Sequence, residues 1–160
     1  MAGAALGEET NLTYNERRVN VRWLGGYRTE IDVRGVHHLQ GDETPQYGGE
    51  DTGPMPTELL LAAVGSCMCL AVAHVARKRS ITLTQISVEV NAEKDMHAFR
   101  FHDIFVTLHA DLPQDQLGQL VEHARHYCFV SNTILKGCNI NYTAESLTSA
   151  ASAGSAGASS

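Results

Sequence analysis

The sequence predicts an α+β domain in which antiparallel sheets pack against two main helices. Two observations support this class. Segments that alternate apolar and polar residues, the pattern of half-buried strands, occur before residue 40 and again between residues 82 and 110. Two longer segments, residues 56–79 and 114–128, have the apolar content and the end signals of helices. Because short turns join neighbouring strands, these strands are expected to pair antiparallel.

The first expected element is a β-hairpin. Residues 18–23 (RVNVRW) and 27–33 (YRTEIDV) alternate apolar and polar positions, and two glycines between them supply the turn. A short third strand is expected at residues 36–39. The next segment, DETPQYGGEDTGPMP, holds three prolines and three glycines, and a loop of that length in a compact domain is often functional.

The first helix is expected to begin near Pro56, because proline suits the first helical turn. It is expected to end at the cations of residues 77–79, which complement the helix dipole. Residues 59–75 (LLLAAVGSCMCLAVAHV) are apolar on every face of this helix. Such a helix must be covered on all sides. One small sheet and one other helix are too few to cover it. We therefore expect an intertwined homodimer rather than a membrane span, since small and polar residues interrupt the run.

The second half of the domain is expected to contain three strands and one helix. The strands are placed at residues 82–92, 100–110 and 138–144, and the helix at residues 114–128. Both chain ends have too little apolar bulk to offset the entropy of ordering. The expected organisation is a disordered N-terminus (1–13), one domain (14–145) and a disordered low-complexity tail (146–160).

The net charge argues against two classes of partner. With a formal charge of −6 and a pI of about 5.7, the chain lacks the clustered cations that nucleic acid and anionic membranes favour. Four cysteines are too sparse for a disulfide scaffold. The first ten residues lack the basic start and the apolar run of a secretory signal. We therefore expect a cytoplasmic protein that binds neither nucleic acid nor membrane, in which any disulfide is functional and transient.

The cysteines are the residues best suited to carry chemistry. Cys67 and Cys69 point about 200° apart on a helix, so only one of them can face a given site. Cys128 lies close to Arg125 and a histidine, and nearby positive charge lowers the pKa of a thiol. Cys138 has no supporting neighbour. The alternative for each is a small core hydrophobe, since free cysteine is among the most buried residue types.

A zinc site and a Cys–His hydrolase are weaker alternatives. Zinc sites use converging Cys and His ligands, typically with C-x2–4-C spacing. The C-x-C pair here diverges, and the eight histidines are scattered along the chain. A Cys–His hydrolase needs a further side chain that orients the histidine, and no such pattern stands out. We therefore expect no metal ion.

Two segments carry a resemblance to a known family. The first is GGEDTGPMPTELLLAAVGSCMCLAVAHVARKR, and the second, further along the chain, is HARHYCFVSNTI. Together with the upstream VRWLGGYRTEIDVRG, they resemble the OsmC/Ohr family of thiol-dependent peroxidases over residues 16–145. The resemblance implies an OsmC-like fold and an intertwined homodimer of α+β subunits, with two sites at the dimer interface.

The resemblance also implies a reaction. Cys67 falls on the family's nucleophile and Cys128 on its resolving cysteine. The Cys67 thiolate would attack the O–O bond of an organic hydroperoxide and become a sulfenic acid, and Cys128 would condense with it to a disulfide. A dithiol reductant, lipoyl-type in some members, would restore both thiols. No metal or organic cofactor takes part, and an apolar pocket would favour alkyl hydroperoxides over hydrogen peroxide.

The sequence departs from the family's pattern in one place. In well-known members an arginine from the N-terminal hairpin contacts the nucleophile, and a glutamate ten residues before the nucleophile holds that arginine. Thr57 stands ten residues before Cys67, and Glu58, one residue later, is rotated about 100° around the helix. Arg28 is the candidate arginine, with two other arginines near the hairpin as alternatives. Glu58 is either the replacement carboxylate or a first-turn cap.

Two other functions remain open on the same fold. A dimeric binding module would hold a small apolar or electrophilic ligand at its interface, and Thr57 in place of the glutamate favours it. A thiol redox sensor would form the same disulfide but turn over slowly. The leading hypothesis is a dimeric antioxidant enzyme that reduces organic hydroperoxides in the response to oxidative stress.

Overall fold

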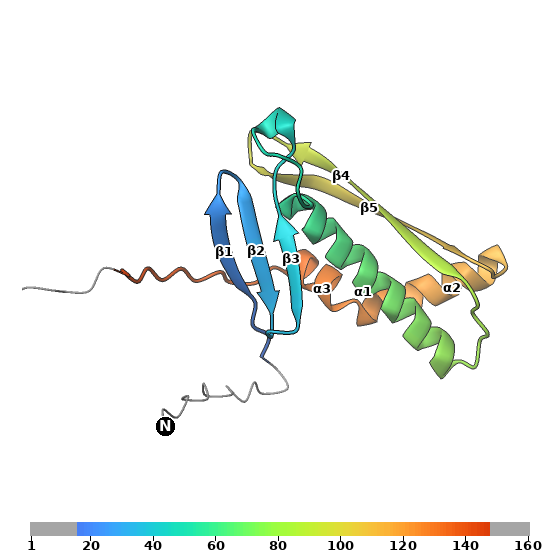
Figure 1. Cartoon of the computed structure of the whole chain (residues 1–160). Coiled ribbons are helices and arrows are strands. Elements are labelled where there is room, and N and C mark those ends of the chain that lie inside the picture. Colours follow the sequence, from blue (N-terminus) through green and yellow to red (C-terminus); the bar gives the residue numbers. More distant parts are fainter. Residues whose placement is uncertain (1–15, 148–160) are drawn as a thin grey trace, which may run out of the picture.

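The computed structural model describes residues 16–147 and has the predicted α+β architecture (Figure 1). The segments expected to be disordered, 1–13 and nearly all of 146–160, lie outside the described residues. The strands are β1 (Asn20–Gly25), β2 (Arg28–Val33), β3 (His37–Gly41), β4 (Ile86–Asp95) and β5 (Arg100–Ala110). The helices are α1 (Pro56–Lys78), α2 (Gln114–Ala124) and α3 (Phe129–Lys136), with short 3-10 turns η1 (Pro45–Tyr47) and η2 (Arg125–Tyr127).

Two antiparallel sheets form from strands that are neighbours in sequence. β1, β2 and β3 make a three-stranded sheet, and β4 and β5 make a long hairpin. The predicted glycine turn between β1 and β2 is confirmed, because Gly25 and Gly26 both have positive φ, which glycine adopts without strain. In the β2–β3 pair, Thr29 faces Gly41. This register places the start of β2 beside the residues that follow β3.

The limits of α1 agree with the sequence prediction. The helix begins at Pro56, with Met55 as its N-cap. The Glu58 carboxylate accepts a hydrogen bond of 2.8 Å from the backbone amide of Met55, which satisfies a donor that the first turn would leave free. Arg77 and Lys78 occupy the last turn, where the helix dipole favours cations. Glu58 therefore acts as a cap in the first turn of α1.

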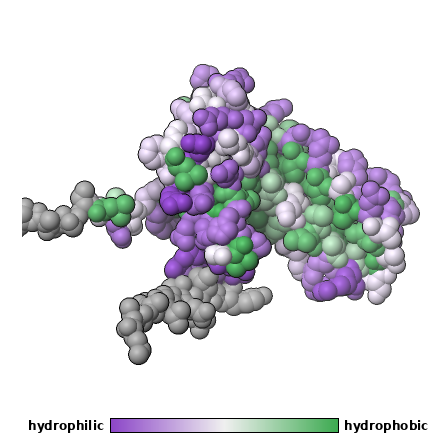
Figure 2. Space-filling model, viewed as in Figure 1, coloured by the Kyte–Doolittle hydropathy of each residue, from purple (hydrophilic) through white to green (hydrophobic). Residues whose placement is uncertain are grey.

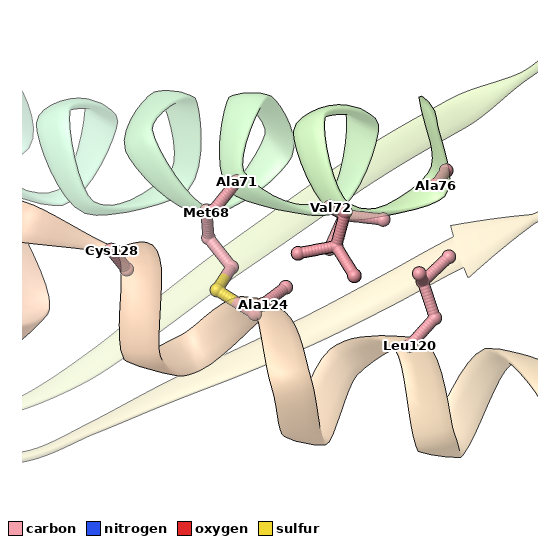
Figure 3. Close-up of a cluster of buried hydrophobic side chains, with 8 residues drawn as sticks. Met68, Ala71, Val72, Ala76, Leu120, Ala124 and Cys128 are labelled. Atoms are coloured by element: carbon pink, nitrogen blue, oxygen red, sulfur yellow. The ribbon is translucent and has the colours of Figure 1, made fainter. Parts of the chain in front are cut away.

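α1 packs against β4 on one side and against α2, η2 and α3 on another (Figure 1). Gly65 permits the close approach to the sheet, since a Cβ there would lie 3.0 Å from Cγ2 of Val90. By length and composition alone α1 could cross a membrane, but in this fold it is the central core helix. The buried cluster between α1 and the C-terminal helices, drawn in Figure 3, consists of Met68, Ala71, Val72, Val75, Ala76, Leu120, Ala124 and Cys128.

A large apolar surface remains uncovered in the single chain. Leu70 on α1 is 68% exposed, Trp23 on β1 is 71% exposed, and Phe99, between β4 and β5, is 89% exposed. Figure 2 shows apolar residues gathered over the part of the molecule formed by α1 and the β4–β5 hairpin. The N-terminal sheet stands to one side of α1 rather than over it (Figure 1). The described residues therefore leave part of the apolar helix without cover.

The structure corrects two predictions for the C-terminal part. The helix predicted at residues 114–128 ends at Ala124, and η2 and α3 follow it. α3 was not predicted because its Val, Ser, Asn, Thr and Ile residues have modest helix propensity; it packs against α1. The strand predicted at residues 138–144 is also absent, and this segment has no regular secondary structure. A strand needs a hydrogen-bonded partner, and within residues 16–147 no other strand pairs with this segment.

Candidate functional site

Cys67 and Cys128 lie on one apolar cluster although 61 residues separate them in sequence. Cys128 is fully buried and belongs to the cluster, whereas Cys67, on α1, is partly buried and packs against it. Cys128 is the N-cap residue of α3, at the point where η2 ends. Figure 3 shows it across from Met68 of α1. The fold therefore places the two cysteines that were predicted to react on the same apolar cluster.

The position of Cys128 is fixed by its neighbours on α3. Its Sγ atom is 2.9 Å from Oγ of Ser131, and either atom can be the donor. The backbone carbonyl of Cys128 accepts a hydrogen bond from the amide of Asn132, at 3.0 Å. Ser131 was not singled out in the sequence, and its one signal is a hydroxyl three residues after the cysteine.

The other two cysteines lie elsewhere. Cys69 lines a cavity of about 350 Å³ between α1 and β4, together with Ser66, Val88 and other residues of these elements. The predicted divergence of the C-x-C pair is therefore confirmed, since Cys67 packs instead against the cluster that holds Cys128. Cys138 is exposed in the segment after α3. Of the four cysteines, only Cys67 and Cys128 share a cluster.

An apolar cavity of about 200 Å³ lies beside Cys128. It lies between α1, β5 and α3, and Ser131, the hydrogen-bond partner of Cys128, is its one polar lining residue. Its apolar lining consists of Val64, Ile104, Val106, Ile134 and Leu135. A cavity with such a lining suits an alkyl group.

Arg28 lies beside the long loop that follows β3, and its Nη1 atom is 3.5 Å from Oε2 of Glu50. Asp42, which is only 1% exposed, organises this loop. Its carboxylate accepts hydrogen bonds from the backbone amides of Glu43, Glu50 and Thr52 and from the Thr52 hydroxyl. Burial by itself raises the pKa of Asp42, but these hydrogen bonds lower it by more, so the pKa lies below its ordinary value of 3.8.

The described residues offer no cluster for a metal ion. Within residues 16–147, no three His, Cys, Asp or Glu side chains are grouped closely enough to hold one.

Similarity to known proteins agrees with this arrangement. The family model of OsmC-like proteins matches residues 48–143, more than half of the chain. The chain belongs to the OsmC family. The matched region includes α1 with Cys67 and the η2–α3 junction with Cys128, so the resemblance based on these two segments is confirmed. β1, β2 and β3, which carry Arg28, lie before the matched region.

Solved structures share the OsmC fold. An organic hydroperoxide resistance protein OsmC from Legionella pneumophila is 23% identical, with a TM-score of 0.64, and the match covers 76% of this chain and 90% of that one. The organic hydroperoxide resistance protein OhrB of Bacillus subtilis is 28% identical, with a TM-score of 0.53, over 74% of this chain and 90% of that one. An uncharacterized protein of Methanocaldococcus jannaschii is 24% identical over 123 residues, which make up 74% of this chain but only 62% of that relative.

The structure does not join the two charged residues that the OsmC resemblance pairs with the nucleophile. Glu58 caps α1 through Met55, and within residues 16–147 no hydrogen bond or ion pair links it to Arg28. Arg28 pairs with Glu50, and within residues 16–147 no hydrogen bond links it to a cysteine sulfur. Glu50 was missed because it lies in a loop, where sequence spacing does not predict which side chains meet.

Proposed function

We propose that this OsmC family member is a cysteine-based peroxidase that reduces organic hydroperoxides, with Cys67 as nucleophile and Cys128 as resolving cysteine. The observation that carries the proposal is the packing of both thiols on one buried cluster, from elements far apart in sequence. The other two cysteines lie apart from it. The relatives named as organic hydroperoxide resistance proteins support the substrate class.

The first step is a two-electron reduction of the peroxide. The Cys67 thiolate attacks the terminal oxygen of R–O–O–H, an S–O bond forms, and the O–O bond breaks. The sulfur is oxidised to sulfenic acid, and the alkoxide leaving group takes up a proton and departs as the alcohol. Arg28 is our candidate for the cation that stabilises the thiolate and the developing oxyanion. Glu58 contributes indirectly, by capping the helix that carries Cys67.

The second step joins the two sulfurs. The Cys128 sulfur attacks the sulfenic sulfur of Cys67, the S–S bond forms, and the oxygen leaves as water. Cys128 is fully buried and shares a hydrogen bond with Ser131. This step therefore requires the backbone to move locally where η2 meets α3. An external dithiol, for which a lipoyl group is our candidate, then reduces the disulfide and is itself oxidised to a disulfide. No metal or organic cofactor is required.

The apolar cavity between α1, β5 and α3 accounts for the preference for an organic peroxide. Its aliphatic lining can bury the alkyl group, and each buried methylene contributes about 0.8 kcal/mol of binding. Hydrogen peroxide has no such group. We therefore expect kcat/KM to rise with the chain length of the hydroperoxide until the cavity is filled.

A homodimer is part of the proposal. A second copy would cover the exposed apolar faces of α1 and of the β4–β5 hairpin, and it would offer a strand partner to residues 138–144, which have no regular secondary structure. Light scattering should give twice the chain mass of 17.3 kDa; a monomer would contradict this part. We expect the enzyme in the cytoplasm, where reductants keep both thiols available.

The test is a comparison of cysteine variants in dithiol-dependent consumption of tert-butyl hydroperoxide. Cys67→Ser should abolish consumption, because serine cannot form a sulfenic acid. Cys128→Ser should allow at most slow turnover and leave Cys67 as a sulfenic acid that dimedone labels. Cys69→Ser is the matched control on the same helix and should retain activity. Consumption that survives in Cys67→Ser would refute the proposal.

A binding module or a slow redox sensor is the second candidate, because Thr57 stands where the family places a glutamate. Thr57 and Leu60 line a further cavity of about 410 Å³, closed by residues of the β4–β5 hairpin such as Phe101. This cavity could hold a small apolar or electrophilic ligand. The pKa of Cys67 discriminates: a value near the ordinary ~8.5 for a thiol favours binding, and a clearly lower value favours catalysis.

A further inference from the structure

Cys128 lies at the junction of η2 and α3, between two helical segments. Its own backbone is extended, with φ −78° and ψ 95°, so the helical path is interrupted at this residue. Its side chain is fully buried. Reaction of this thiol therefore depends on a local opening of the junction, since a buried group reacts only while the segment around it is displaced.

The residue before Cys128 is held against α1 by two contacts. The ring of Tyr127 lies 5.4 Å from the ring of His74, centroid to centroid, with an angle of 58° between the two planes. The Nζ atom of Lys78 lies 5.3 Å from the centroid of the same tyrosine ring. Tilted ring pairs and a cation over an aromatic face are both attractive at such distances. We call the contact of Tyr127 with His74 and Lys78 the Tyr127 clamp.

The Tyr127 clamp uses the same face of α1 that carries Cys67. His74 and Lys78 follow Cys67 in the sequence of α1, and their spacings correspond to about two and about three full helical turns, so the three side chains form one stripe. One helix thus carries the proposed nucleophile and both side chains that hold Tyr127. A movement that takes Cys128 out of the buried cluster also moves Tyr127, its neighbour in the chain, relative to α1. The clamp therefore opposes that movement.

Burial does not account for the Tyr127 clamp. Tyr127 is 53% exposed, so its ring contributes little to the apolar core. Phe129, on the other side of Cys128, is 81% exposed, and among the residues that the structure describes its ring has no aromatic or cationic partner. The two aromatic residues that flank the thiol therefore differ in one respect: the ring of Tyr127 is tied to α1, and the ring of Phe129 is not.

We infer that the Tyr127 clamp keeps Cys128 buried and thereby sets the rate at which Cys128 reacts with the sulfenic acid of Cys67. Tyr127 is a positioning residue, because it acts through the backbone of Cys128 and not on the reacting atoms. The inference rests on the proposed function. In the step concerned, the S–S bond forms, the S–O bond of the sulfenic acid breaks, and the thiol proton of Cys128 leaves with the oxygen as water. The clamp therefore prolongs the lifetime of the sulfenic acid.

The first experiment measures how fast N-ethylmaleimide alkylates Cys128 in the reduced, folded, full-length chain, with each cysteine resolved by mass spectrometry. Each of the two contacts of the clamp favours the closed junction by about two- to fivefold. Tyr127→Leu should therefore speed alkylation of Cys128 about four- to twenty-five-fold, because the rate follows the population of the open junction. Lys78→Met removes one contact and should speed it about two- to fivefold. The double variant should be no faster than Tyr127→Leu alone, since both changes act on one ring.

The chain offers a matched control for each variant. Phe129→Leu removes the other exposed ring beside Cys128, and Arg77→Met removes a cation from the same last turn of α1. Both should leave the alkylation rate of Cys128 unchanged. The rate at Cys69 in the same samples is the internal reference, because global unfolding would speed alkylation of both cysteines, whereas loss of the clamp should affect Cys128 alone.

The second experiment follows a single turnover with one equivalent of tert-butyl hydroperoxide, stopped at intervals with dimedone, which labels the Cys67 sulfenic acid. Tyr127→Leu should leave the rate of sulfenic acid formation unchanged and shorten the lifetime of the sulfenic acid by the factor found for Cys128 alkylation. A residue with a merely structural role would not change the lifetime while sparing the formation rate.

The outcomes separate this inference from the proposed function. If Tyr127→Leu leaves alkylation of Cys128 unchanged or slows it, the clamp does not hold the junction, and the inference is overturned whatever the protein does with peroxide. Faster alkylation together with a longer-lived sulfenic acid would mean that the clamp presents Cys128 to Cys67, and it would also overturn the inference. If the wild type forms no Cys67–Cys128 disulfide, the proposed function fails and with it the link to the sulfenic acid, while faster alkylation would still support the clamp as the contact that keeps Cys128 buried.

Discussion

Oxidation by a stoichiometric amount of tert-butyl hydroperoxide should stabilise the protein through a Cys67–Cys128 disulfide. The bond would close a loop of about 60 residues, and a loop of that length contributes about 4 kcal/mol by restricting the unfolded chain. Against this stands the hydrogen bond between Cys128 and Ser131, 2.9 Å in the reduced protein, whose loss costs about 1 kcal/mol. The free energy of unfolding should therefore be about 3 kcal/mol higher for the oxidised protein than for the reduced one.

The assay is urea unfolding of the reduced and oxidised proteins at one protein concentration, followed by circular dichroism. The free energy of unfolding of a small protein falls by about 1–3 kcal/mol for each molar of urea, so the urea concentration at the midpoint should rise by about 1–3 M on oxidation. Cys128→Ser, treated with the same peroxide, is the control and should show no rise. Equal chain concentrations are needed because an oligomer is more stable at higher concentration.

Two results would refute this reasoning. A disulfide that forms between Cys67 and Cys128 while the midpoint stays the same or falls would mean that the bond distorts the packed cluster. The two thiols would then not be placed to join, although both pack on that cluster. A disulfide that instead involves Cys69 or Cys138 would contradict the assignment of the resolving cysteine.

Two further predictions concern the scaffold that holds the site. Leu120→Ala should lower the free energy of unfolding by about 2–5 kcal/mol, because Leu120 is fully buried in the cluster beside α1; a loss below about 1 kcal/mol in urea unfolding would contradict that placement. The hydroxyl of Thr84 and the amide of Gln85, which donate to Asp111, hold its pKa below the ordinary 3.8. Since the charged form is favoured in the folded state, this stabilisation should be present at neutral pH and be lost as pH falls below about 4 through the lowered pKa. Asp111→Asn should therefore unfold more easily at pH 7 and show a weaker acid dependence than the wild type, and identical acid profiles would count against the Thr84–Asp111 link.

The candidate site was only partly predictable from the sequence. Local sequence features left several cysteines open, and the resemblance to the OsmC/Ohr family selected Cys67 and Cys128 as the candidate pair. Glu58 was recognised as a possible cap because capping acts within one helical turn. The partner of Arg28 was not predictable in this way. Glu50 meets Arg28 only because sheet register and loop closure bring positions 28, 42 and 50 together.

The sequence by itself determined the α+β class, the first five strands, the limits of α1 and the divergence of Cys67 from Cys69. These features depend on the period of apolar residues, on glycine turns and on the 100° rotation per helical residue, all of which act over a few positions. Tertiary structure alone decided that Cys128 belongs to the cluster against which Cys67 packs and that α3 forms despite weak propensity. It also decided that residues 138–144 pair with no strand of residues 16–147. These outcomes depend on partners that are remote in sequence, because burial and strand pairing are satisfied by whatever surface the fold brings near.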